Sequence, residues 1–104
     1  MDIARASLGF AAIGSEQRLA VLLMLVKAGR LGMTVGQIQE KSGMAPSTLA
    51  HHLRMLADGE LITQRRDGRS VINRANFDHL ESLVSYLMKE CCANEIVQSE
   101  GDVA

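Results

Sequence analysis

Apolar residues recur at spacings of three and four through the first part of the chain, which predicts helices. The first such segment ends at Gly14, and Ser15 suits the N-cap of a second helix because its hydroxyl can accept a hydrogen bond from a free backbone N–H. The second helix ends near Gly29. The apolar positions are Ile3, Leu8, Phe10, Ala11 and Ile13 in the first segment and Leu19, Leu22, Leu23 and Val26 in the second.

Residues 34–59 contain two further helix patterns, separated by a tight turn. A short helix capped by Thr34 ends at Ser42-Gly43. Pro46 suits the first turn of the next helix, where no N–H is needed. That helix has an apolar stripe which we expect to face the core, formed by Leu49, Leu53 and Leu56. A short helix, a tight turn and a second helix are the parts of a helix-turn-helix.

Residues 61–75 alternate in polarity on either side of Asp67-Gly68, a dipeptide typical of the centre of a type I′ hairpin turn. Asn76 then caps a last helix whose apolar face reaches Cys91, and the periodicity fades after Asn94. This apolar face is formed by Leu80, Leu83, Val84 and Leu87. The patterns together predict a mainly α fold with a small β-hairpin: a winged helix-turn-helix of five helices, with the wing between the fourth and the fifth.

The charges are unevenly distributed, although the net charge is only −1. Residues 1–43 and residues 44–75 each carry five Lys or Arg against three Asp or Glu, whereas residues 76–104 carry one against six. The average hides a basic part, which suits nucleic-acid binding. Hydrophobic residues make up 47% of the 104 residues, enough for one packed domain. We expect this domain over residues 1–93 and a flexible acidic tail over residues 94–104.

Several other classes of protein are not expected. No apolar run approaches the roughly 18 residues of a membrane span, and the N-terminus lacks the basic start and long apolar stretch of a signal peptide. We therefore expect a cytoplasmic protein with no membrane partner. No Ser-His-Asp arrangement, glycine-rich phosphate loop or pair of buried carboxylates stands out, so we do not expect an enzyme.

The fourth predicted helix includes Ser47-Thr48-Leu49-Ala50-His51-His52-Leu53-Arg54-Met55-Leu56. With five helices and a hairpin before the last, this stretch resembles the ArsR/SmtB family of bacterial repressors, and the resemblance extends from about Leu8 to Cys92. One departure is the order Gly59-Glu60-Leu61, since the family more often has its glycine directly before the leucine. The resemblance implies a homodimer built on the first and last helices, which binds double-stranded operator DNA without a cofactor.

A dimer also makes physical sense for a DNA reader of this size. Two recognition helices about 34 Å apart double the interface and read an inverted repeat. The first and last helices carry more apolar surface than one small core needs, which suits a dimer interface. The residues concerned are Leu8, Phe10, Ile13, Leu80, Leu83 and Leu87.

The candidate DNA-binding residues lie on the fourth helix and on the hairpin. On the helix they occupy the outer face, and on the hairpin they surround the turn, positions suited to base edges and phosphates. They are Ser47, Thr48, His51 and Arg54 on the helix and Arg65, Arg66 and Arg69 on the hairpin. The alternative is a charged, solvated surface. His52 falls on the inner stripe and Arg74 far from the turn, so we expect structural roles for both.

The metal sites known in the family are missing here. Its zinc sensors place an Asp and several His along the last helix, but this helix offers Asp78, His79 and no second histidine. Another family site is a Cys-x-Cys on the helix before the recognition helix. It would fall around Gln37–Gly43, where there is no cysteine.

Cys91 and Cys92 are therefore the expected sensor. Adjacent thiols on a helix end would diverge by about 100°, too strained for an easy mutual disulfide yet able to converge on a large thiophilic atom. Trivalent arsenic or antimony fits this description. Because there is no third cysteine, we favour methylarsenite, and we expect both thiols to be mostly protonated at pH 7. The alternatives are a thiol-redox or persulfide response, two inert cysteines, or a winged helix that binds protein and not DNA.

Overall fold

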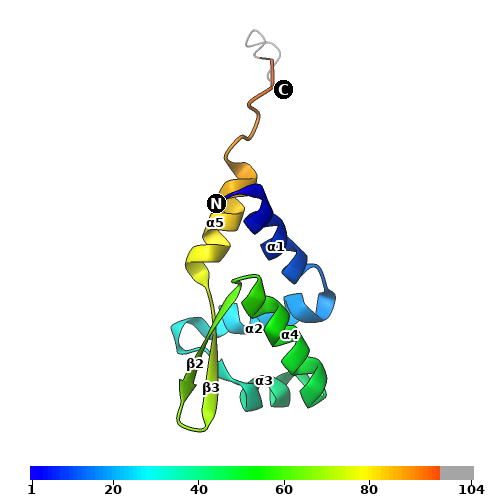
Figure 1. The fold of residues 1–104 in the computed structure, drawn as a ribbon, viewed down its shortest axis with the longest axis vertical. Coiled ribbons are helices and arrows are strands. Elements are labelled where there is room, and N and C mark those ends of the chain that lie inside the picture. Colours follow the sequence, from blue (N-terminus) through cyan, green and yellow to red (C-terminus); the bar gives the residue numbers. More distant parts are fainter. Residues whose placement is uncertain (97–104) are drawn as a thin grey trace.

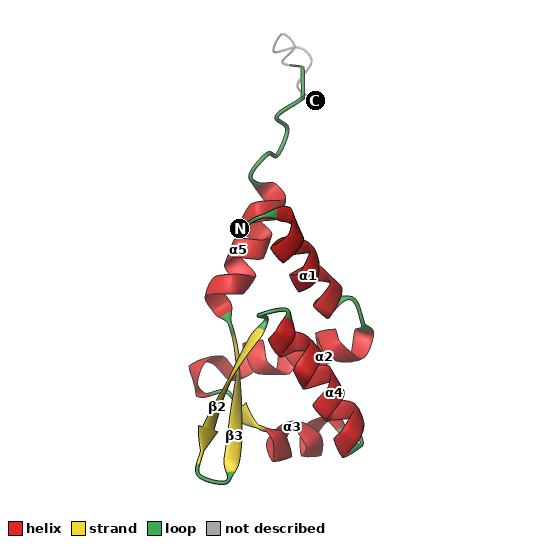
Figure 2. Cartoon of the chain, in the orientation of Figure 1, coloured by secondary structure: helices red, strands yellow, loops and turns green. Residues whose placement is uncertain are grey.

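A computed structural model of the chain describes residues 1–96, and Figure 2 shows its helices and one small sheet. The elements in chain order are α1 (Ile3–Ile13), α2 (Glu16–Ala28), the 3-10 helix η1 (Gly29–Leu31), β1 (Met33–Thr34), α3 (Val35–Ser42), α4 (Pro46–Asp58), β2 (Ile62–Asp67), β3 (Ser70–Ala75) and α5 (Phe77–Met88). The predicted fold class, with the β2–β3 wing between α4 and α5, is confirmed. Most of the predicted acidic tail lies outside the described residues.

The sheet contains one strand that the sequence pattern did not predict. Its strand order is β1-β3-β2, and β1 pairs Met33 with Asn73 and Thr34 with Ile72. A strand of two residues is too short to show an alternation in the sequence. It nevertheless holds the segment before α3 against the wing.

The turn of the wing lies one residue later than predicted. Asp67 pairs with Ser70 at the end of the ladder, so Gly68 and Arg69 are the central residues of the turn. Gly68 has a φ of 63°, and Arg69 does not share the positive φ. A glycine with positive φ at the first central position is the pattern of a type II′ turn. The predicted type I′ turn centred on Asp67-Gly68 is therefore wrong, although both types suit the twist of a hairpin.

The core forms between the helices and one face of the sheet. Its largest fully buried side chains are Leu25, Ile38, Leu49, Leu56, Leu61, Leu83 and Val21. The stripe predicted on α4 is confirmed, because Leu53 is buried beside Leu49 and Leu56. Burial of this stripe turns the opposite side of α4 towards solvent.

Helix α1 packs through its small residues and leaves its large ones exposed. The buried positions are Ala6, Gly9 and Ala12. A Cβ at Gly9 would lie 3.0 Å from a methyl carbon of Leu83, so α1 approaches α5 closely at this point. Leu83 is consequently a core residue and not part of an open apolar face as predicted, whereas Leu8, Phe10 and Leu87 remain exposed.

The apolar positions noted in the sequence of α2 do not coincide with its buried side. Its buried residues are Val21, Leu22 and Leu25. Of the four positions noted, only Leu22 is buried, and Leu19, Leu23 and Val26 are exposed. The helix is apolar on more than one side, so its periodicity alone cannot show which side meets the core.

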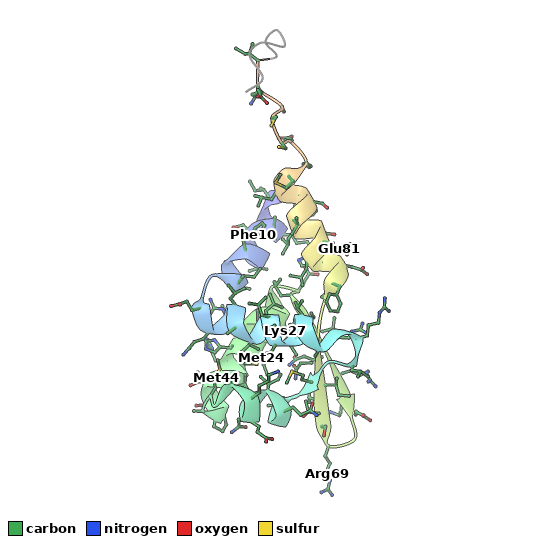
Figure 3. The ribbon with its side chains drawn as sticks, turned by 180° about the vertical axis from the view of Figure 1, so that it is seen from behind. Phe10, Met24, Lys27, Met44, Arg69 and Glu81 are labelled. Carbon is green, nitrogen blue, oxygen red and sulfur yellow. The ribbon has the colours of Figure 1, made fainter. Side chains whose placement is uncertain are left out.

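The molecule is elongated in Figure 1, with α1 and α5 at the upper end and α3 and the wing turn at the lower end. Figure 3 shows Phe10 and Glu81 in the upper part and Arg69 at the lower tip. Within residues 1–96 no single helix is long and apolar enough to cross a membrane; α1 and the segment Glu16–Leu31 pass that test only together, as a pair bent by 97°.

Candidate nucleic-acid interface and thiol pair

Helix α4 presents the four predicted DNA-binding side chains on one exposed surface. Ser47, Thr48, His51 and Arg54 are all exposed, whereas the neighbouring positions of the core stripe are buried. Ser47, His51 and Arg54 follow each other at intervals of four and three residues, so they share one side of the helix. This exposed surface extends over about two turns of α4.

The first turn of α4 also lacks a side-chain cap. Its N-cap residue, Ala45, has no side chain that can accept a hydrogen bond, and Pro46 follows it. The other four α-helices of the described part are capped by Asp2, Ser15, Thr34 and Asn76. The free N–H groups and the positive end of the helix dipole favour an anion beside Ser47 and Thr48.

The wing carries its predicted arginines on two faces. Arg65 pairs with Ile72 and Arg66 pairs with Val71, so their side chains leave opposite faces of the ladder. The face that includes Val71 is turned towards α4, where both elements line a cleft. The cleft is lined by Val35, Ala50, Leu53, Arg54, Ala57, Asp58, Gln64 and Val71. Arg66 therefore lies on the side of the recognition helix, and Arg65 lies on the outer side.

The two cysteines lie outside the helix on which they were expected. Helix α5 ends at Met88, and residues 89–94 form turns. Both cysteines are exposed, Cys92 has a φ of 65°, and the two Sγ atoms are 3.3 Å apart. The expectation of thiols that diverge by about 100° on a helix end is wrong. The left-handed residue turns the second thiol back towards the first.

The comparisons with known proteins agree with this geometry. A family model described as a helix-turn-helix domain matches residues 13–65, about half of the chain. This chain belongs to that helix-turn-helix family. No curated protein matches its sequence significantly. Solved structures are similar to nearly the whole described part of this chain.

Three of these structures have the same winged fold. An ArsR-like transcriptional regulator from Rhodococcus sp. RHA1 has a TM-score of 0.74 and 23% identity, over 88% of this chain and 82% of that one. The homodimeric winged helix-turn-helix DNA-binding domain Mb0332 from Mycobacterium bovis has a TM-score of 0.66 and 23% identity, over 92% of this chain and 89% of that one. The transcriptional repressor BigR from Xylella fastidiosa has a TM-score of 0.62 and 22% identity, over 83% of this chain and 85% of that one. The resemblance to ArsR-family regulators is confirmed in the fold.

The groups around Cys92 favour the protonated form of its thiol. Hydrogen bonds with Cys91 and then with Glu95 raise the pKa of the Cys92 thiol, and a small loss of hydration adds to this. The direction agrees with the expectation of protonated thiols. Residues 1–96 contain no group of three or more His, Cys, Asp and Glu that could hold a metal ion. A ligand at the pair therefore receives two protein thiols from this chain.

His52 has the structural role that its position predicted. It is 7% exposed, and its Nε2 lies 2.9 Å from Oε1 of Gln17 on α2. Burial lowers the pKa of His52, and the charges of Arg18 and His51 lower it further. The ring is therefore neutral at pH 7 and links α2 to the inner side of the recognition helix.

Two further arginines near the wing were not among the predicted DNA-binding residues. Arg74, expected to be structural, is exposed. The sequence predicted no role for Arg30, yet Arg30 lines the same hollow on the outer side of the wing as Arg65 and Arg74. No local pattern could have revealed Arg30, because the strands that it meets follow more than thirty residues later.

Proposed function

We propose that this chain is a homodimeric transcriptional repressor that binds operator DNA through α4 and the wing. The observation that carries the proposal is the concentration of exposed polar and basic side chains at one end of the molecule. They come from the uncapped start of α4, its outer side and the wing: Ser47, Thr48, His51, Arg54, Arg65, Arg66 and Arg69. Nearly all of these side chains can donate hydrogen bonds to phosphates or base edges.

Dimerisation is supported by the opposite end of the molecule. Helices α1 and α5 lie side by side there (Figure 1), and their outer sides carry large apolar residues. The exposed ones are Ile3, Leu8, Phe10, Val84, Leu87 and Met88. An apolar patch of this kind on a small protein marks an interaction surface. A second copy would cover it and supply the second recognition helix that an inverted repeat requires.

The inducer that best fits Cys91 and Cys92 is a trivalent arsenical. Two sulfur atoms 3.3 Å apart subtend an angle of about 90° at an atom about 2.3 Å from each, a typical metal–thiolate distance. That angle suits a pyramidal trivalent centre and is narrower than the tetrahedral angle of zinc. With two thiols on the chain, a methyl carbon would occupy the third position of methylarsenite. Its two hydroxyl groups would leave as water with the two thiol protons, so no oxidant is needed.

Release of DNA would follow from the place of the pair in the chain. Cys91 and Cys92 lie three and four residues after the end of α5, which packs on α1 in the proposed dimer region. A bridging atom would lock the turn after α5 and shift how two copies of this helix meet. A coupling of only about 1–3 kcal/mol between the two sites lowers DNA affinity by roughly 5- to 150-fold.

Fluorescence anisotropy with an operator selected from a random duplex library would test both parts. We expect binding that weakens steeply with salt, and dissociation when methylarsenite is added. Cys91→Ser and Cys92→Ser should bind DNA normally and should not respond, while Ser85→Ala on α5 serves as the matched control and should respond like the wild type. Transcription in vitro from a promoter with this operator should fall when the protein is added.

The same assay separates the alternatives. If peroxide or a persulfide donor releases DNA and arsenicals do not, the pair is a redox sensor. Release by methylarsenite from both cysteine variants would show that the inducer site lies elsewhere. The absence of DNA binding at low salt would overturn the repressor and favour a module that binds protein.

A further inference from the structure

The outer face of the wing forms a basic hollow, of which the operator contacts proposed above use only Arg65. It has a volume of about 440 Å³ and lies between the wing and η1. Its lining residues are Arg30, Thr63, Gln64, Arg65, Ile72 and Arg74. We refer to Arg30, Arg65 and Arg74 as the outer arginine site.

The register of the wing brings two of these arginines together. Arg65 lies opposite Ile72, and Arg74 lies opposite Thr63. Because alternate residues of a strand share a face, Arg65 and Arg74 project from the same side as diagonal neighbours, about 7–8 Å apart at their backbones. Their long side chains can therefore reach one extended anionic ligand.

The third arginine is placed by a tight approach of backbone to backbone. Arg30 belongs to η1, and Gly32 follows with a φ of 65°. A Cβ at Gly32 would lie 2.3 Å from the carbonyl oxygen of Asn73. Only glycine allows this contact, which fixes the segment against β3 and sets Arg30 beside the wing.

The charge of the site is not neutralised within the described chain. None of the residues that line the hollow is acidic. Asp78 lines a smaller neighbouring hollow together with Arg30 and Arg74, but the one ion pair found within residues 1–96 joins Arg5 to Glu60. An anion between the guanidinium groups would relieve the repulsion of like charges on adjacent strands. Guanidinium groups bind phosphate oxygens in a bidentate manner.

We propose that the outer arginine site binds backbone phosphates of DNA that flanks the half-site and bends towards the wing. Arg74 lies four residues beyond Ser70, about 13 Å from the end of the ladder. The minor groove is only about 7.5 Å deep, so the backbone at Arg74 and Arg30 lies above the groove of a straight duplex that receives the wing turn. Flanking DNA that curves upwards along the outer face meets them. This inference rests on the proposed function as a DNA-binding repressor.

The experiment compares two duplexes that contain the same selected operator. The minimal duplex holds only the two half-sites, and the extended duplex adds about 10 base pairs, one helical turn, on each side. We expect the wild type to bind the extended duplex about 10-fold more tightly and with a steeper salt dependence, the slope of log K changing by about 0.9 for each added phosphate contact. Energy transfer between dyes at the ends of the extended duplex should rise on binding.

The double variant Arg30→Ala/Arg74→Ala should bind the minimal duplex like the wild type and lose the gain on the extended one. Lys89→Ala removes one positive charge near the other end of the chain and should keep the gain. Circular dichroism checks that the variants fold. If the double variant keeps the gain, or weakens binding to both duplexes equally, the inference is wrong.

Two further comparisons distinguish DNA phosphates from small phosphate ligands, and a failure of this inference from a failure of the proposed function. Inorganic phosphate and adenosine monophosphate are titrated into the wild type and followed by NMR. One outcome would assign the site to a small phosphate and overturn its assignment to DNA. In it, phosphate causes chemical-shift changes at the outer arginine site of the wild type but not of the double variant, while the double variant still binds the extended duplex more tightly than the minimal one. If the wild type binds neither duplex, the proposed function itself fails. If it binds both with equal affinity, only this inference fails.

Discussion

Helix α4 begins in solvent and ends against α1, and its two ends are built differently. At the first end Ala45 offers no cap, and Ser47 and Thr48 are exposed. At the other end Gly59 is buried, and a Cβ there would lie 2.7 Å from the Cβ of Ala12 on α1. Glu60 follows and accepts two hydrogen bonds from Arg5, at 2.6 and 2.7 Å. The recognition helix is thus free where it would read DNA and fixed where it meets the proposed dimer region.

This difference explains the unusual order Gly59-Glu60-Leu61. Glu60 has a φ of 64°, the left-handed conformation for which glycine is normally favoured. The helix end is still closed, because the Leu61 N–H donates to the Leu56 carbonyl at 2.9 Å. Glu60 occupies the strained position while its carboxylate binds Arg5, and glycine is needed one residue earlier for the contact with α1. The contrast shows that α1 holds the C-terminal end of α4, through the close packing at Gly59 and the ion pair of Arg5 with Glu60.

The largest effect should come from filling the contact at the fixed end. Gly59→Ala places a methyl group between α1 and α4, and overpacking of this kind lowers the free energy of unfolding by about 1–3 kcal/mol. Gly36→Ala is the matched control, because its Cβ would meet only Thr34 Oγ1, at 3.9 Å, within α3. That change should be neutral or should stabilise by up to about 1 kcal/mol. Urea unfolding measures both, and equal values for the two variants would contradict the close packing.

At the free end, substitution should change DNA binding and leave folding unaffected. His51→Ala removes an exposed donor from the outer side of α4, and loss of one base contact costs about 1–3 kcal/mol, which is roughly 5- to 150-fold in affinity. His52→Gln, one residue along, should lower stability through its buried contact with Gln17 and change affinity less. Anisotropy and thermal unfolding of both variants separate the two roles. A stability loss at His51 with unchanged affinity would reverse their assignment.

How far the sequence could predict this arrangement depends on how local each feature is. The stripe of Leu49, Leu53 and Leu56 predicted both faces of α4, because one buried side defines the other. The contact of Arg5 with Glu60 joins residues 55 positions apart, which no spacing rule detects. The geometry of the thiol pair depends on where α5 ends and on the left-handed conformation of Cys92. The sequence could not give it, because helix boundaries are the least certain part of a prediction from sequence patterns. The sequence could therefore identify the end of the molecule for which we propose DNA contacts, while the contacts that hold it needed the structure.

The smallest effect should come from the ion pair at the fixed end, which is exposed to solvent. Arg5→Ala leaves Glu60 in its left-handed conformation without a partner, whereas Glu60→Gly removes the pair but also relieves the backbone. We therefore expect Arg5→Ala to lower Tm by a few degrees at most and Glu60→Gly to lower it less. A greater loss in Glu60→Gly would mean that the side chain matters more than the backbone strain.

The pH dependence of that difference identifies its electrostatic part. The hydrogen bond and charge of Arg5 lower the pKa of Glu60, so the folded state holds this carboxylate ionised more strongly than the unfolded chain does. The stabilisation is fully present above the ordinary carboxyl pKa of about 4.3 and is lost as the pH falls through the lower folded value. The Tm difference between wild type and Arg5→Ala should therefore be constant from pH 7 to about 5, shrink below about pH 4, and decrease in high salt. A difference that persists at pH 3 would show that Arg5 acts by packing its aliphatic stem against the end of α4, and that the position of the recognition helix does not depend on charge.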